Sequence, residues 1–153
     1  MKLPDLFLFP GDWEAYVEDV YQIFLDEIAH ANLKFRGLKI SCQYRPPTQG
    51  KHFGFWHVIS EGKEENERVP DLRRCERIRW IAFLIENAEE SDAISWWENE
   101  RRGNTHVVIW HEEENFVVIL SKRKNYYLLK TAYCAEPHRR KGFIRERDMF
   151  WDH

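Results

Sequence analysis

The stretch that decides the fold is "THVVIWHEEENFVVILSKRKNYYLLKTAYC", residues 105–134. It contains three runs rich in apolar, β-branched and aromatic residues, near 105–111, 115–121 and 126–134. Runs of this length and composition are typical of β-strands. The polar segments "EEE" and "KRKN" separate them, and connections this short join antiparallel neighbours. The stretch therefore predicts a meander of three consecutive antiparallel strands.

Helical patterns lie on both sides of this meander. Residues 13–33 repeat apolar side chains at three- and four-residue steps, and Asp12 stands where an N-cap is expected. A similar apolar stripe predicts a second helix over residues 71–86. The basic segment after Pro137 is predicted to form a short helix at the end of the chain.

Two more segments have strand character. Residues 36–44 alternate apolar and polar side chains. The segment "HFGFWHVIS", residues 52–60, is rich in residues that favour strands. In a strand, the ionisable His57 would share a face with Phe55.

These elements predict an α+β fold, in which the helices pack on one face of an antiparallel sheet. A chain of 153 residues is expected to form a single domain. Residues 1–33 would form an acidic N-terminal helix. Residues 34–153 would form the core, which ends in a basic segment.

The net charge of −3 hides an uneven distribution. Residues 1–33 carry seven acidic residues against one lysine, and residues 120–147 carry nine basic residues against two glutamates. The basic segment either attracts phosphates or neutralises the acidic segment across one small surface.

Composition also bears on where the protein acts. No apolar run approaches the roughly 18 residues of a membrane span, and the N-terminus lacks the pattern of a signal peptide. Cys42, Cys75 and Cys134 are an odd number of widely spaced cysteines, which fits reduced thiols. We therefore expect a cytoplasmic protein without membrane partners.

Several kinds of chemistry are not supported by the sequence. It contains no glycine-rich phosphate loop and no nucleophile elbow. His106 and His111 are five residues apart, so on one strand they would point to opposite faces and could not share a metal ion. The remaining histidines, arginines, lysines and tyrosines fit metal-free RNA cleavage. That reaction needs an acid–base pair and phosphate-binding cations, but no cofactor.

Three segments together resemble phage- and prophage-associated proteins of the barnase–EndoU–colicin–RelE nuclease superfamily. They are "FWHVISEG" (55–62), "PDLRRCERIRW" (70–80) and "VVILSKRKNYYLLKTAY" (117–133), and the resemblance spans about residues 52–147. It implies helices followed by a four-stranded antiparallel sheet, as in barnase and RelE. It also implies metal-independent endoribonuclease activity, often as a toxin or anti-phage effector.

The resemblance also implies site residues. His57 would be the general base or acid, Arg74 and Arg77 would bind the scissile phosphate, and Thr131 and Tyr133 would line the cleft. Other candidate substrate-binding residues are Lys51, His52, Lys130, Arg139 and Arg140. Lys130 stands where a large apolar residue is expected in such proteins.

Each candidate also has a purely structural interpretation. His57 could be a packed core histidine, and Arg74 and Arg77 could belong to a solvated helix face. A second function class therefore stays open, a non-catalytic nucleic-acid- or protein-binding phage accessory module. For the nuclease, the expected partners are RNA and an immunity or antitoxin protein.

Overall fold

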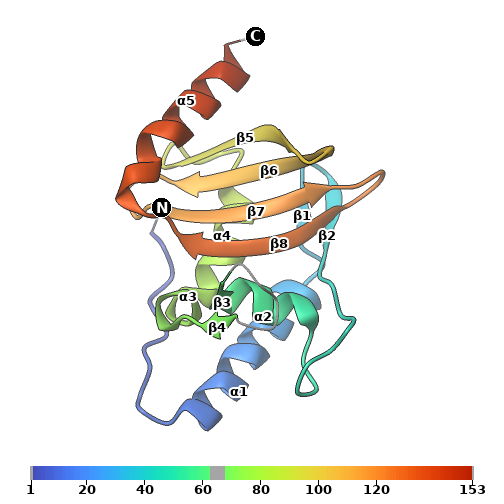
Figure 1. Cartoon of the computed structure of the whole chain (residues 1–153), viewed down its shortest axis with the longest axis vertical. Coiled ribbons are helices and arrows are strands. Elements are labelled where there is room, and N and C mark those ends of the chain that lie inside the picture. The colour runs from blue at the N-terminus through green and yellow to red at the C-terminus, as the bar shows by residue number, and fades with distance from the viewer. Residues whose placement is uncertain (1, 63–67, 153) are drawn as a thin grey trace.

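The computed structural model describes residues 2–62 and 68–152. Its centre is a mixed six-stranded sheet with the strand order β1-β2-β8-β7-β6-β5. The strands are β1 (Lys34–Phe35), β2 (Leu38–Ser41), β5 (Ile94–Arg101), β6 (Asn104–His111), β7 (Phe116–Lys122) and β8 (Tyr127–Cys134). Figure 1 shows this curved sheet above a layer formed by the helices α1 (Trp13–Phe24), α2 (Phe53–Ile59) and α3 (Leu72–Glu76).

The predicted meander and the α+β class are confirmed. Strands β6, β7 and β8 pair in antiparallel fashion, with Val108 opposite Ile119 and Ile119 opposite Thr131. The expectation of four antiparallel strands is wrong in detail, because β2 pairs in parallel with the start of β8 and brings β1 into the sheet.

Strand β5 was also missed in the sequence. It pairs with β6 through a tight hairpin whose two turn residues, Arg102 and Gly103, have φ values of 51° and 80°. Two consecutive positive φ angles are what a type I′ hairpin turn requires. An Arg-Gly pair is a weaker signal for this turn than Asn-Gly, so the sequence alone does not predict the hairpin.

Helix α4 (Ile78–Asn87) covers one face of the sheet, and Figure 1 shows it behind the strands. Helix α1 (Trp13–Phe24) packs against α4. Asp12 caps α1, as predicted, by accepting a hydrogen bond from the main-chain N–H of Ala15 at 3.3 Å. The predicted helix over 13–33 ends earlier, after one π-helical turn at Leu25–Ala29.

The predicted helix over 71–86 is two helices. Helix α3 (Leu72–Glu76) is separated from α4 by Arg77, whose φ of −102° and ψ of 17° are not helical. Asp71 caps α3 by accepting from the main-chain N–H of Arg73 at 2.9 Å. A short two-stranded ribbon, β3 (Ser60–Glu61) and β4 (Val69–Pro70), precedes it.

The segment 52–60, which has strand character in the sequence, instead forms a helix, α2 (Phe53–Ile59). It buries Phe55, Val58 and Ile59, which recur at the three- and four-residue spacing of a helix. Gly54 permits this packing, because a Cβ atom there would lie 3.3 Å from the main-chain N and O of Gln43. Close packing therefore outweighs the strand propensity of the segment.

Helix α5 (Arg140–Trp151) follows a 3₁₀ turn at Pro137–Arg139, so the helix predicted after Pro137 is confirmed. It packs on the opposite face of the sheet from α4, where Phe143 contacts Trp97 and Trp110 at ring-centroid distances of 5.8 and 5.4 Å. The expectation that all helices lie on one face is therefore wrong. We call the face that α5 partly covers the outer face.

Among residues 2–62 and 68–152, no helix combines the length and the apolar character needed to cross a membrane.

Candidate functional site

The C-terminal end of α2 is held by side chains from three other segments. The main-chain carbonyl of His57 accepts hydrogen bonds from Arg68 at 3.1 Å, from Arg74 at 3.4 Å and from the Thr131 hydroxyl at 3.1 Å. Arg68 and Arg74 also donate to the carbonyl of Ser60. Carbonyls at a helix end lack partners within the helix, and their partial negative charge favours cationic donors.

The ring of His57 is half-buried on the opposite side of α2 from the core. It packs against Phe53, one helical turn earlier, with ring centroids 4.5 Å apart. A strand would have placed Phe55 beside His57, but Phe55 is fully buried in the core. The aromatic support of the histidine therefore comes from Phe53.

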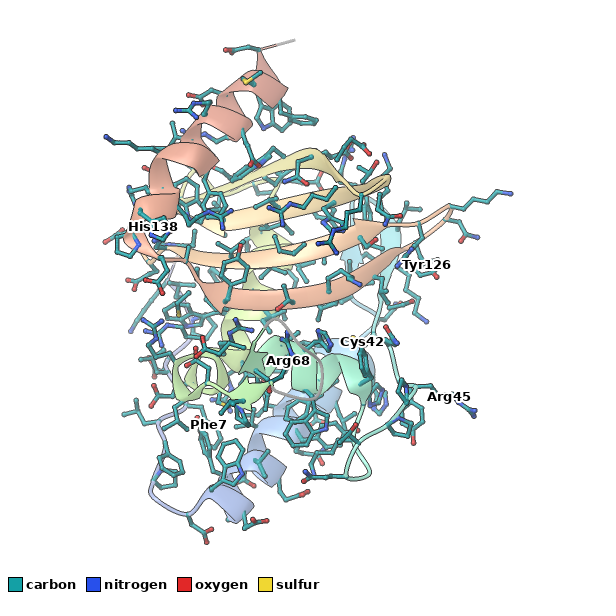
Figure 2. The ribbon with its side chains drawn as sticks, viewed as in Figure 1. Phe7, Cys42, Arg45, Arg68, Tyr126 and His138 are labelled. Carbon is teal, nitrogen blue, oxygen red and sulfur yellow. The ribbon has the colours of Figure 1, made fainter. Side chains whose placement is uncertain are left out.

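An open cavity of about 520 Å³ lies between α2, α3 and the outer face of the sheet. We call it the basic cleft, and its lining residues are His57, Gly62, Arg68, Arg74, Arg101, Lys130, Thr131 and Tyr133. The lining includes four arginine or lysine side chains, and no aspartate or glutamate is among these described lining residues. Figure 2 shows Arg68 beside α2, just below β8.

This cleft brings together most of the residues predicted as catalytic. His57, Arg74, Thr131 and Tyr133 all line it, and Lys130 joins them. Arg68 and Arg101 were not predicted, because neither stands in a recognisable motif. Their positions depend on the β3–β4 ribbon and the β5–β6 hairpin, which bring them to the cleft.

Arg74 and Tyr133 lie together in the cleft, and both side chains are half-buried. The guanidinium of Arg74 lies 5.8 Å from the centroid of the Tyr133 ring. Burial lowers the pKa of Arg74, an effect that Asp71 opposes. Burial raises the pKa of Tyr133, and Arg139, Arg101 and Arg74 only partly offset this effect. Tyr133 is therefore a protonated hydroxyl donor at neutral pH.

Lys130 enters the cleft through an irregularity in β8. Ile119 of β7 pairs with Thr131, whereas the next residue, Leu120, pairs with Leu129. Lys130 is thus the extra residue of a β-bulge, which re-aims side chains at this point of the strand. Lys130 and Thr131 both line the cleft, although neighbouring residues of a regular strand point to opposite faces.

A second, smaller cavity of about 180 Å³ continues along the outer face. It shares Arg101, Lys130, Thr131 and Tyr133 with the basic cleft and adds His106 and Arg139. Burial lowers the pKa of His106, and the nearby Lys130, Arg101 and Arg123 lower it further. His106 was considered only as a metal ligand in the sequence, and its place near the cationic residues is visible only in the fold.

The other predicted residues lie elsewhere. Arg77 packs over the Trp80 ring at 5.0 Å and donates to the carbonyl of Arg73. Arg140 forms an ion pair with Glu112 at 3.1 Å on the far part of the sheet. These two residues line neither the basic cleft nor the smaller cavity beside it.

Lys51 and His52 are packed at the N-terminal end of α2. Lys51 is buried and forms an ion pair of 2.5 Å with Glu18 of the acidic helix α1. His52 accepts or donates a hydrogen bond with the Tyr21 hydroxyl at 2.8 Å. Burial and, secondarily, His30 lower the pKa of His52. Both residues join α2 to α1 and do not reach the basic cleft.

In the described parts of the chain, no three His, Cys, Asp or Glu side chains gather in a way that could hold a metal ion.

Comparisons with known proteins give no relative. No family model, no curated protein and no solved structure matches the chain. Membership of the nuclease superfamily therefore rests on the sequence resemblance and stays a prediction.

Proposed function

We propose that this protein is a metal-independent endoribonuclease whose active site is the basic cleft. The observation that carries the proposal is the gathering of Arg68, Arg74, Arg101 and Lys130 around His57. A cleft lined by cations of one sign concentrates a polyanion such as RNA. An imidazole at its wall is suited to proton transfer near neutral pH.

The proposed reaction is attack of a 2′-hydroxyl oxygen on the adjacent phosphorus. The bond from phosphorus to the 5′-oxygen breaks, and a 2′,3′-cyclic phosphate remains. A base takes the proton of the 2′-hydroxyl, and an acid returns a proton to the leaving 5′-oxygen. Arg101 and Lys130, both exposed, would bind the scissile phosphate and stabilise the charge of the pentacoordinate state.

Two histidines are available for the proton transfers. His57 lies at the α2 wall of the cleft, and His106 lies beyond Lys130 and Arg101 on β6. The lowered pKa of His106 keeps its imidazole neutral at pH 7, so we assign it the role of general base. We assign the second proton transfer to His57, and the Tyr133 hydroxyl is a donor to the phosphate oxygens.

A second function is favoured by a specific observation. Arg68, Arg74 and Thr131 all donate to main-chain carbonyls at the end of α2. Groups engaged in this way stabilise the fold, and they would be less available to a reacting phosphate. A non-catalytic RNA-binding module with the same cleft would have this arrangement too.

The nuclease proposal has further parts. It includes a barnase- or RelE-like ancestry, action in the cytoplasm as a toxin or phage effector, and an immunity protein as partner.

Single-turnover cleavage of RNA separates the two functions. The enzyme is expected to cleave in the presence of EDTA and to leave 2′,3′-cyclic phosphate ends. His57→Ala and His106→Ala should each slow cleavage by about 10²–10⁴-fold. His138→Ala is the matched control, since His138 is exposed at the turn into α5, at the edge of the sheet in Figure 2. RNA binding without cleavage would favour the non-catalytic module, and cleavage that needs Mg²⁺ would exclude the proposed mechanism.

A further inference from the structure

A separate cavity of about 370 Å³ adjoins the basic cleft, with which it shares His57 and Arg68. Three aromatic rings, from Trp13, Phe53 and Trp56, line it, together with Thr48, Gln49 and Pro70. His57, Ser60 and Arg68 complete its lining. We call it the aromatic pocket.

The rings of this pocket lie at the margin of the core, against which Trp13 and Trp56 pack. Phe53, Trp56 and Trp13 are half-buried, whereas Phe55 and Val58 on the other side of α2 are almost fully buried. These aromatic side chains leave part of their rings in an open cavity, although neighbouring residues of α2 are buried in the core. Ligand sites are typically lined by aromatic side chains in this way.

Local contacts fix the walls. The indole N–H of Trp56 donates to the carbonyl of Thr48 at 2.9 Å, which joins the loop before α2 to the helix. Phe53 packs against His57, and Trp13 lies against Tyr16 with ring centroids 6.3 Å apart. Rings held in this way lose little freedom when a ligand enters.

The lining is matched to a flat heteroaromatic ring with polar edges. Aromatic walls stack on the faces of such a ring, and the Gln49 amide and the Thr48 hydroxyl can bond to its edge. The volume is sufficient for a ligand of this size, since small-molecule sites begin at about 300 Å³. A nucleobase has these properties, whereas an aliphatic ligand would leave the polar groups without partners.

The position of the aromatic pocket relative to the basic cleft indicates which nucleotide of an RNA strand would place its base there. His57 and Arg68 line both cavities, so a ligand in the aromatic pocket lies next to a phosphate in the basic cleft. We propose that the aromatic pocket holds the unpaired base of the nucleotide beside the phosphate in the cleft. The substrate class is therefore single-stranded RNA, because a base stacked and paired in a duplex cannot enter. This inference rests on the proposed function in that the cleft must bind RNA phosphate.

Binding of a non-cleavable 2′-O-methyl oligoribonucleotide tests the pocket without depending on catalysis. Two forms of the probe are compared by fluorescence anisotropy, one with all bases and one with a single abasic position. Trp56→Leu and Trp13→Leu should each weaken binding of the complete strand by about tenfold or more. Neither should change binding of the corresponding duplex. Trp151→Leu is the control, since Trp151 is exposed near the end of α5.

The abasic probe gives the decisive comparison. The abasic position is moved along the strand, and at one place it should weaken binding to the wild type. The folded Trp variants should bind this abasic probe no more weakly than they bind the complete strand. The salt dependence should stay unchanged, because the phosphate contacts remain. If both folded variants bind the complete strand as the wild type does, the pocket inference is wrong, whether or not the protein cleaves RNA. If the base preference appears but no RNA is cleaved, the pocket inference stands and the nuclease proposal fails. If no strand binds at all, both fail.

Discussion

The Thr131 hydroxyl donates a 3.1 Å hydrogen bond to the main-chain carbonyl of His57, across 74 positions of sequence. The bond joins β8 to the end of α2, at a place where β2 no longer pairs with β8. The helix thus covers an edge of the strand that would otherwise be open. The main-chain carbonyl of His57 thus fixes the position of this residue relative to the sheet, and its half-buried side chain lines the cleft.

Replacing Thr131 by valine tests this link. Valine keeps the β-branched shape and removes the donor, so unfolding in urea should show a stability loss of about 0.5–1.5 kcal/mol. Thr131→Ser keeps a hydroxyl, and we expect it to retain more of the stability than Thr131→Val. Equal losses in the two variants would mean that the methyl group matters here, not the hydrogen bond.

We expect Arg74 to contribute more to the stability of the fold than Thr131 does. Its side chain is 11% exposed and donates to the carbonyls of His57 and Ser60. Arg74→Met keeps much of the packing volume but removes charged donors from buried carbonyls, so we expect a loss of about 1.5–3 kcal/mol. Arg73 lies one residue earlier, on the exposed side of α3. The free energy of unfolding of Arg73→Met should therefore lie within about 0.5 kcal/mol of the wild-type value. A similar midpoint for both variants would contradict the capping role.

The meander could be predicted from the sequence because each strand carries its own apolar signal and the turns are short. Helix α2 could not, because Phe, Trp, Val and Ile favour strands and the close contact of Gly54 with Gln43 is a tertiary property. The bulge that turns Lys130 into the cleft leaves no mark in the sequence either.

The candidate site shows the same division. Of the catalytic residues that the resemblance implies, the fold brings His57, Arg74, Thr131 and Tyr133 into one cleft. Arg77 packs over Trp80 instead. Arg68, Arg101 and His106 were not found, because long-range pairing alone places them near these residues. Lys51 and His52 precede His57 closely in the chain, but the helical turn directs them toward α1.

Lys130 should contribute to RNA affinity through its charge. Lys130→Gln is expected to weaken binding of a non-cleavable RNA, and the difference from wild type should shrink as salt rises. The slope of log K against log salt should fall by about one unit. Lys39→Gln makes the same change of charge on the exposed part of β2 and should have a smaller effect. Equal effects of the two substitutions would indicate general electrostatic attraction without a defined site.

The cysteines should be unreactive in the native protein. Cys75 is fully buried, and burial raises the pKa of its thiol to about 12. Burial also raises the pKa of Cys42 to about 12. Since the thiolate is the reactive form, iodoacetamide at pH 8 should leave both unlabelled, whereas all three cysteines should react in urea. Rapid native labelling of Cys75, read by peptide mass spectrometry, would contradict its placement in the core.

The pH dependence of His106 connects the electrostatics of the cleft to its proposed chemistry. Burial, and then Lys130, Arg101 and Arg123, lower its pKa from the ordinary 6.5. A general base acts in its neutral form, so the acid limb of the kcat/KM profile should lie below pH 6.5. Lys130→Gln removes one positive neighbour, which should raise the pKa of His106 and move this limb to higher pH. Lys39→Gln should leave it in place.

An NMR titration of the His106 ring measures the same shift without any assay of activity. We expect a midpoint below 6.5 in the wild type and a higher one in Lys130→Gln. If the ring titrates as expected while the acid limb does not move, His106 is a histidine of the cation cluster without a part in proton transfer. If the basic limb moves instead, His106 acts as the general acid, and His57 takes the role of the base. A midpoint that is the same in both proteins would show that Lys130 and His106 are not electrostatically coupled, and the smaller cavity would lose its place in the mechanism.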